Sequence, residues 1–288
     1  MTYRVTVPDV TAQGVLRLRE RSFGPGQLVI MARVGRTTGA PAPARDTAAA
    51  MDRVHAVVAE GADLVDLGGG PARPGTDLSG GPTGSGANLG GGPAGSGTDL
   101  GHGPAGSGTE VTAADEIRWA VPLVASVRAA YPDLIIGVGA WRHETARELC
   151  AAGADLLQDH GERLPEVAAE YGAGLLCGNA ERAVARGVHP SRVLIEADMG
   201  SWPRPWPSPE ATRRLEDIVA AGWPVLVSVP EPSGDRGPAG SLAAAAVWAW
   251  LGARVFRADQ VTRTRRVLDM VSAIQGDRPP ARALRGLA

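Results

Sequence analysis

The sequence contains no lysine, and all 29 of its basic side chains are arginine. Because an arginine guanidinium stays protonated in proteins, no mechanism that needs a lysine amine as a nucleophile or a base can run in this chain. Asparagine is nearly absent as well and occurs only at Asn88 and Asn179. The net charge of -2 gives no basic excess of the kind that binds nucleic acid or an anionic membrane, so we expect neither partner.

Cysteine and long apolar runs are also scarce. The two cysteines, Cys150 and Cys177, fall in segments that we expect to be buried, which argues against a disulfide framework and indicates a reducing compartment. The longest apolar stretch, Leu242 to Ala253, is too short to span a bilayer. The first residues carry no apolar run typical of a signal peptide. Together these absences predict a cytoplasmic protein.

What the sequence does contain is a regular alternation of short apolar runs and amphipathic helical patterns, from about residue 27 to residue 275. We expect strands at Leu28–Val34, Asp63–Leu67, Leu134–Val138, Ala154–Gln158, Gly174–Cys177, Arg192–Glu196, Val225–Val229 and Ala253–Arg257. We expect helices at Asp46–Ala59, Ala113–Ala130, Glu144–Ala152, Pro165–Tyr171, Glu181–Arg186, Glu210–Ala221, Leu242–Leu251 and Thr262–Ile274. Eight such units predict an α/β protein with a (β/α)8 TIM barrel, and a doubly wound sheet is the alternative.

A glycine-rich repeat interrupts this alternation after the second strand. An eleven-residue unit recurs as LGGGPARPGTD from Leu67, LSGGPTGSGAN from Leu78, LGGGPAGSGTD from Leu89 and LGHGPAGSGTE from Leu100. Only the first copy carries an arginine, Arg73. Each copy has one leucine to bury, so residues 75–110 cannot offset their ordering entropy and are predicted to form a flexible insertion. The chain then divides into an N-terminal extension at 1–26, a barrel at 27–275 and a tail at 276–288.

In a TIM barrel the reacting groups lie at the carboxyl ends of the strands. At those ends this chain places Asp66 and Arg73, Gln158 and Asp159, Glu196 and Asp198, and Arg257 and Asp259. Two arginines on neighbouring strand ends could clamp a diphosphate, although a structural ion pair is the alternative for each of them. The carboxylate of Glu196 could hold the guanidine-like edge of a heterocycle. His143 and His160 lack a second ligand at metal spacing, so no metal site is predicted.

Several segments follow one another in an order and at a spacing that point to a known family. They are LVIMARVGRTTG, GADLVDLGGGPARPG, WRHETARELCAAGADLLQD, RVLIEADMG, AAGWPVLVSV and GARVFRADQVTRTRRVLDMVSAIQGDRPPARALRGLA. In these segments the chain resembles the dihydropteroate synthase family, and most closely its actinobacterial second paralogue. The resemblance covers about residues 27–288 without the insertion. It implies a TIM barrel, usually dimeric, whose active members join p-aminobenzoate to a pterin that carries a diphosphate leaving group.

The resemblance also implies where ligands would bind. It places the diphosphate at Arg73 and Arg257, and the pterin at Glu196 and Gln158, which stand at a family aspartate and a family asparagine. The family's magnesium-binding asparagine corresponds to Gly35 here, so we expect no magnesium site and no other cofactor.

Other positions of the family's site have lost their functional side chains. Ala72 stands at a threonine of the diphosphate loop, Gly139 at a pterin-binding aspartate, Pro232 near a lysine, and Asp259 at a histidine. The connection between the fifth and sixth barrel strands is also shortened. Losing one well-placed group typically costs about 2–4 kcal/mol of transition-state stabilisation. Several such losses predict negligible synthase activity.

We therefore interpret the chain as a degenerate paralogue with little or no synthase activity that still binds a pterin or a diphosphate ligand. It would act as a homodimer or as the partner of an active synthase. The alternative hypothesis is an active synthase that condenses p-aminobenzoate with 6-hydroxymethyl-7,8-dihydropterin diphosphate through substituted residues. A third hypothesis is a structural subunit without any ligand.

Overall fold

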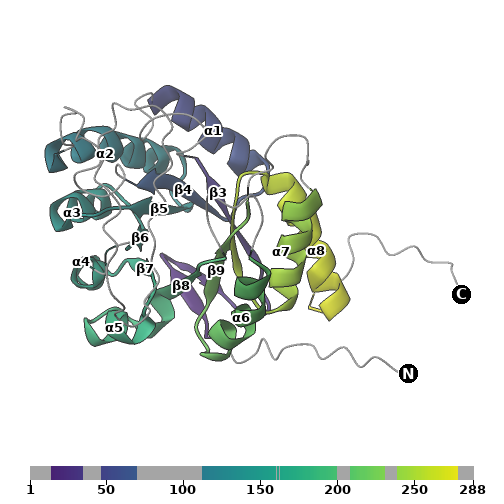
Figure 1. Cartoon of the computed structure of the whole chain (residues 1–288). Coiled ribbons are helices and arrows are strands. Elements are labelled where there is room, and N and C mark those ends of the chain that lie inside the picture. Colours follow the sequence, from purple (N-terminus) through teal and green to yellow (C-terminus); the bar gives the residue numbers. More distant parts are fainter. Residues whose placement is uncertain are drawn as a thin grey trace, which may run out of the picture.

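The computed structural model describes residues 14–34, 47–69, 112–159, 161, 163–199, 208–230 and 239–277 (Figure 1). Eight parallel strands of these residues close a barrel in the order β10-β3-β4-β5-β6-β7-β8-β9. The strands are β3 (Val29–Arg33), β4 (Leu64–Gly69), β5 (Ile135–Gly139), β6 (Leu156–Gln158), β7 (Gly174–Cys177), β8 (Val193–Ala197), β9 (Val225–Ser228) and β10 (Val255–Ala258). This architecture confirms the predicted (β/α)8 TIM barrel and excludes the alternative of a doubly wound sheet.

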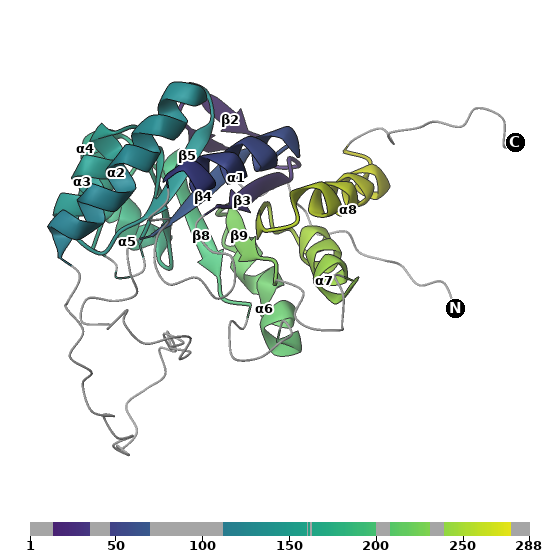
Figure 2. The same ribbon diagram turned by 90° about the horizontal axis from the view of Figure 1, so that it is seen from above.

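Eight α-helices in the described residues surround the strands (Figures 1 and 2). They are α1 (Thr47–Ala59), α2 (Ala113–Ala130), α3 (His143–Ala151), α4 (Pro165–Tyr171), α5 (Ala180–Ala185), α6 (Pro209–Ala220), α7 (Ala239–Trp250) and α8 (Val261–Gln275). Helices α4 and α8 each end on a glycine in the left-handed conformation, Gly172 with φ 60° and Gly276 with φ 87°. These glycines accept a backbone conformation that other residues adopt only with strain. Helix α5 is short, as the sequence predicts.

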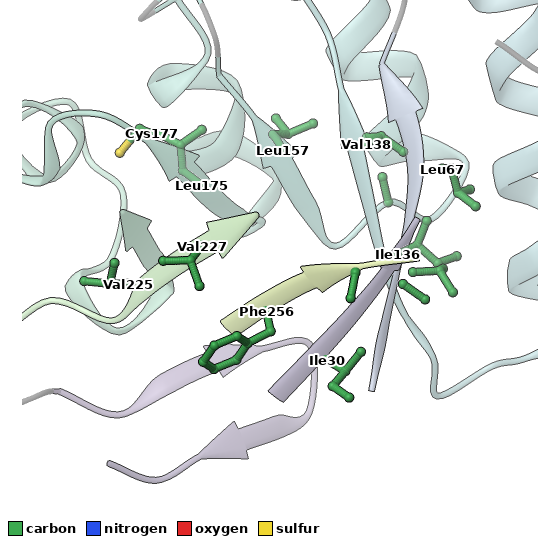
Figure 3. Close-up of a cluster of buried hydrophobic side chains, with 14 of the residues drawn as sticks. Ile30, Leu67, Ile136, Val138, Leu157, Leu175, Cys177, Val225, Val227 and Phe256 are labelled. Carbon is green, nitrogen blue, oxygen red and sulfur yellow. The ribbon is translucent and has the colours of Figure 1, made fainter. Parts of the chain in front are cut away.

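The barrel strands are buried on both faces, which explains their nearly continuous apolar sequences. Outward-facing side chains such as Ile30, Ile136, Leu157, Val227 and Phe256 pack against the helices in one large cluster (Figure 3). The inward-facing side chains of the strand starts form a second, separate cluster. Its members are Leu16, Leu18, Phe23, Val29, Met31, Leu64, Ile135, Leu156, Leu176, Leu194, Leu226 and Val255.

A short hairpin closes the amino-terminal end of the barrel. Strands β1 (Leu16–Leu18) and β2 (Arg21–Phe23) pair antiparallel, and Leu16, Leu18 and Phe23 are at most 1% exposed. Gly174 at the start of β7 makes room for this hairpin, because a Cβ atom there would lie 2.3 Å from Cδ2 of Leu18. The sequence predicted residues 1–26 only as an extension, so the hairpin and its role as a plug are findings of the structure.

Arginine side chains attach the hairpin to the barrel. Arg254, just before β10, is 1% exposed and donates hydrogen bonds to the carbonyl oxygens of Gly14 (2.6 Å), Phe23 (2.8 Å) and Gly24. Burial lowers the pKa of the Arg254 guanidinium to about 10, so it remains charged at neutral pH. Arg19 of the hairpin turn forms a further ion pair with Asp155 at 3.4 Å.

Parts of the predicted organisation lie outside the described residues. These are the glycine-rich insertion at 75–110, the tail beyond residue 277 and the first 13 residues. Among the helices that the structure describes, none combines the length and the apolar character needed to cross a membrane.

Candidate functional site

A ring of polar side chains lies directly above the apolar cluster inside the barrel. Successive side chains of a strand point to opposite faces, so the residue two places after an inward-facing one also faces inward. Each polar residue follows an apolar member of the inner cluster in this way. The pairs are Leu64 and Asp66, Leu156 and Gln158, Leu194 and Glu196, Leu226 and Ser228, and Val255 and Arg257. We call Asp66, Gln158, Glu196, Ser228 and Arg257 the polar ring, and it stands toward the carboxyl ends of the strands.

Arg257 is the centre of the polar ring. Its Nη1 donates to Oε1 of Glu196 at 2.8 Å and lies 3.4 Å from Oγ of Ser228. Its Nη2 donates to Oε1 of Gln158 at 3.0 Å. Its Nε lies 3.2 Å from Oδ2 of Asp66, an ion-pair contact in which the N–H direction does not reach hydrogen-bond geometry. One guanidinium therefore contacts groups from four other strands.

Asp66 and Gln158 complete the ring. Nε2 of Gln158 donates to Oδ1 of Asp66 at 2.7 Å, so the amide of Gln158 accepts from Arg257 and donates to the carboxylate. The backbone N–H of Gly68 donates to the same Oδ1 at 2.9 Å. Gly68 has a φ of 82°, in the left-handed region that favours glycine. This hydrogen bond, at a register irregularity between Asp66 and Gly69 of β4, fixes the direction of the Asp66 carboxylate.

Most of the polar ring is shielded from solvent. Asp66, Gln158 and Arg257 are 7%, 4% and 8% exposed, whereas the side chain of Glu196 is 29% exposed. The ring contains two carboxylates and one guanidinium, so its negative groups outnumber its positive one. Buried charges are tolerated when they are paired and hydrogen-bonded, which these are. Glu196 and Ser228 are the partly exposed members of the ring.

A second ion pair lies further toward the mouth. Nη1 of Arg33, at the end of β3, donates to Oδ2 of Asp259 at 2.6 Å and to the carbonyl of Val229 at 3.2 Å. Arg53 of α1 donates to the backbone carbonyl of Asp259 at 2.7 Å. Asp259 is therefore held by two arginines of neighbouring elements, and its carboxylate is engaged by Arg33.

Comparisons with known proteins support the family that the sequence motifs suggest. No family model matches the chain. A Mycobacterium tuberculosis protein named inactive dihydropteroate synthase 2 is 36% identical, over 84% of this chain and 80% of its own length. The chain belongs to the dihydropteroate synthase family. The solved structure of Mycobacterium tuberculosis Rv1207 is 35% identical, with a TM-score of 0.62 over 88% of this chain and 95% of that one.

A more distant likeness supports the fold alone. A Coxiella burnetii dihydropteroate synthase, solved in complex with pteroic acid, is 17% identical with a TM-score of 0.67. It covers 92% of this chain and 99% of its own. The dihydropteroate synthase fold is therefore retained across nearly the whole barrel, although most of the sequence has diverged.

The structure brings together three of the four residues that the family resemblance assigned to ligands. Glu196, Gln158 and Arg257 lie in one hydrogen-bonded group, whereas the sequence had divided them between a pterin site and a diphosphate site. Arg73, the fourth, lies outside the described residues, as does Gly35. Asp66 was recognised as a strand-end carboxylate but was not assigned to the site.

Other candidate residues have different surroundings. The carboxylate of Asp159 accepts hydrogen bonds from the backbone N–H groups of Gly161 (3.2 Å), Arg163 (2.9 Å) and Leu164 (3.0 Å), so it orders the loop before α4. Gly139, which the resemblance places at a family aspartate, is the last residue of β5. Within the described residues, no group of three His, Cys, Asp or Glu residues could hold a metal ion. Because Gly35 lies outside the described residues, the absence of a magnesium site remains a prediction.

Sequence reasoning missed Ser228 and Arg33. Both lie at strand ends within segments that carry the family resemblance, but neither was singled out there as a site residue. The two-residue periodicity of a strand could have identified Ser228, because it follows the inward-facing, buried Leu226 by two residues. Arg33 follows Met31 of the inner cluster by the same spacing.

Proposed function

We propose that this protein is a non-catalytic member of the dihydropteroate synthase family. The observation that carries the proposal is the polar ring, in which Arg257 bonds to Glu196 and Gln158 and lies in ion-pair contact with Asp66. These side chains are the polar groups that the described part of the site retains, and they bond to one another. A synthase needs such groups to hold its substrates, so groups that already bond to one another are poorly suited to this task. The name of the M. tuberculosis relative, an inactive synthase, supports the same conclusion.

The substituted positions give the magnitude of the loss. A glycine at position 139 cannot supply a carboxylate, and a glycine at position 35 has no side-chain oxygen for a metal. Each lost group is worth about 2–4 kcal/mol of transition-state stabilisation, or roughly 30- to 1000-fold in rate. Two such losses, even when they are not fully additive, bring the rate down by several orders of magnitude.

The proposal extends to what the protein retains. We propose that Glu196 and Gln158 remain the residues for a pterin, and that Arg73 and Arg257 remain those for a diphosphate. The common location of Glu196, Gln158 and Arg257 supports a single ligand site, and the contacts of Arg257 imply that ligand binding is weak. We also propose that the protein acts in the cytoplasm as a homodimer or as the partner of an active synthase.

Two assays test the absence of synthase activity. Purified protein at micromolar concentration is incubated with p-aminobenzoate and the pterin diphosphate, and dihydropteroate is measured by mass spectrometry. We expect no product above the protein-free blank, while an active synthase assayed in parallel gives product within minutes. The gene is also expected not to rescue a strain that lacks its synthase. Product formation, or rescue of that strain, would establish the alternative hypothesis of an active synthase.

Calorimetry tests the ligand site. We expect pyrophosphate and a pterin to bind the wild-type protein with micromolar or weaker affinity. Arg73→Ala should weaken pyrophosphate, and Glu196→Ala should weaken the pterin. Arg213→Ala, on the exposed side of α6, is the matched control and should change neither. If neither ligand binds at millimolar concentration, the hypothesis of a structural subunit is correct.

A further inference from the structure

The guanidinium of Arg257 occupies the interior of the barrel. In the closed strand order, β6 is four strands away from β10 in both directions, so the two strands lie on opposite sides. The hydrogen bond from Arg257 of β10 to Gln158 of β6 therefore crosses the barrel. The contacts with Asp66 of β4 and Glu196 of β8 reach two further parts of the wall.

The surrounding acceptors converge on this one group. Carboxylates of Asp66 and Glu196 and the amide oxygen of Gln158 lie within 2.8 to 3.2 Å of its nitrogens. No other arginine of the described residues pairs with either carboxylate. A planar cation with several N–H donors is the chemical complement of such a set, because a guanidinium can address several oxygen acceptors at once.

Space inside the ring also depends on a glycine. Gly137 of β5 faces this interior, and a Cβ atom there would lie 2.5 Å from Cε of Met31 and 3.8 Å from Nε2 of Gln158. The absence of a side chain at Gly137 thus lets Met31 extend inward, whereas a Cβ atom there would make only an ordinary van der Waals contact with Gln158. The wall at this level is completed by long side chains from other strands, with the guanidinium of Arg257 among them.

Removing the guanidinium would leave two carboxylates facing each other without a cation. An uncompensated buried charge is strongly unfavourable, whereas a cation of the same shape restores the pairing. We propose that the polar ring is a binding site for guanidinium-type cations, and that the chain's own Arg257 is its resident occupant. This inference rests on the proposed non-catalytic function, because it explains the absence of turnover by a site that is already filled.

Chemical rescue tests the inference. In Arg257→Ala the ring is vacated, and we expect the midpoint of thermal unfolding to fall by several degrees. Methylguanidinium chloride should then raise that midpoint with the logarithm of its concentration, by about 4 °C at ten times its dissociation constant. The wild-type protein should show no such rise, because its ring is already filled. Methylammonium chloride at the same concentration controls for ionic strength and for cations without the planar N–H edge.

Two variants serve as matched controls. Arg33→Ala also removes an arginine from a carboxylate, that of Asp259, but at the mouth and outside the ring, so methylguanidinium should not rescue it. Adding Glu196→Gln to Arg257→Ala removes one of the ring's two charges and should weaken the rescue at least fivefold in concentration.

The outcomes of the rescue experiment support or overturn the guanidinium site. If Arg257→Ala does not fold alone, Arg257→Met, which retains the apolar stem, is refolded with and without methylguanidinium, and folding only in its presence supports the inference. Equal rescue by methylammonium, equal rescue of Arg33→Ala, or failure of both Arg257 variants to respond overturns it. None of these results depends on synthase turnover, which is assayed separately on the wild-type protein.

Discussion

Arg254 and Arg257 lie three residues apart, yet they belong to opposite ends of the barrel. Arg254 donates to backbone carbonyls of the hairpin at the amino-terminal end. Arg257 donates to side chains, those of Glu196 and Gln158, toward the carboxyl-terminal end. The partners of Arg254 are backbone carbonyls, which every sequence provides. The partners of Arg257 are carboxylate and amide side chains, which are present only because the strands carry these particular residues.

The comparison separates stability from chemistry. In TIM barrels the amino-terminal end contributes stability and the carboxyl-terminal end carries the reacting groups. Here both ends are filled from within, the lower one by the hairpin with Phe23 and the upper one by the guanidinium of Arg257. The lower filling is apolar, whereas the upper filling is a charged group that is paired with two carboxylates. Variants at each end can test this difference.

The largest effect is expected at the apolar plug. Phe23→Ala removes a side chain that is 1% exposed and leaves a cavity beneath the barrel, which should cost about 4 kcal/mol of the free energy of unfolding. Urea denaturation followed by circular dichroism measures the loss. Val15→Ala, at a neighbouring residue that is 39% exposed, should cost less than about 0.5 kcal/mol. Equal stability of the two variants would show that the hairpin does not plug the barrel.

Replacing Arg254 should have the next largest effect. Arg254→Met retains the apolar stem but leaves three carbonyl oxygens without their donor, and we expect a loss of about 3 kcal/mol. The same urea titration measures it, and limited proteolysis should cut the hairpin segment sooner than in the wild type. Arg213→Met on the exposed face of α6 should be nearly neutral. A stable, protease-resistant Arg254→Met would contradict the anchoring role.

These two ends also differ in how well the sequence predicted them. The barrel strands follow from apolar periodicity, and each of these eight strands begins and ends within two residues of its expected bounds. The hairpin could not be predicted in the same way, because each of its strands spans three residues and too few alternating positions are present to show a period. Its burial depends on Gly174, far away in the sequence.

Prediction of the site was limited for a different reason. The motifs identified Glu196, Gln158 and Arg257 as polar residues at the ends of strands. Sequence spacing, however, does not show with which residue a long side chain forms its hydrogen bonds. The resemblance assigned Arg257 to a diphosphate, whereas the geometry places its guanidinium against Glu196 and Gln158. Its assignment to a diphosphate remains a prediction, as does that of Arg73.

A smaller effect is expected for a charge change in the polar ring. Glu196→Gln retains an oxygen that accepts from Nη1 of Arg257, and the Glu196 side chain is 29% exposed, so the loss should be at most about 1 kcal/mol. Denaturation at low and high salt measures it, with the exposed Glu216→Gln of α6 as the control. A loss as large as that of Phe23→Ala would show that the two ends do not differ in tolerance.

The smallest effect concerns a buried thiol next to the amino-terminal end. Burial, with smaller contributions from the carboxylates of Asp155 and Glu170, raises the pKa of Cys150 from 9.0 to about 12. This raised pKa stabilises the fold fully below pH 9, and the contribution is lost as the pH rises toward 12, because the unfolded chain releases the thiol proton first. At neutral pH the stability should therefore be unaffected by Cys150→Ala beyond the lost packing.

Alkylation turns this thiol into a reporter that distinguishes the two ends. In a Cys177→Ala background only Cys150 can react, and its thiolate is the reactive form. Iodoacetamide at pH 8.5 should label the folded protein at least 100-fold more slowly than the unfolded protein. Adding Phe23→Ala should accelerate labelling, because it lowers the free energy of opening, whereas Glu196→Gln should change the rate little. Equal acceleration by both substitutions would mean that the plug and the polar ring stabilise the barrel to the same extent.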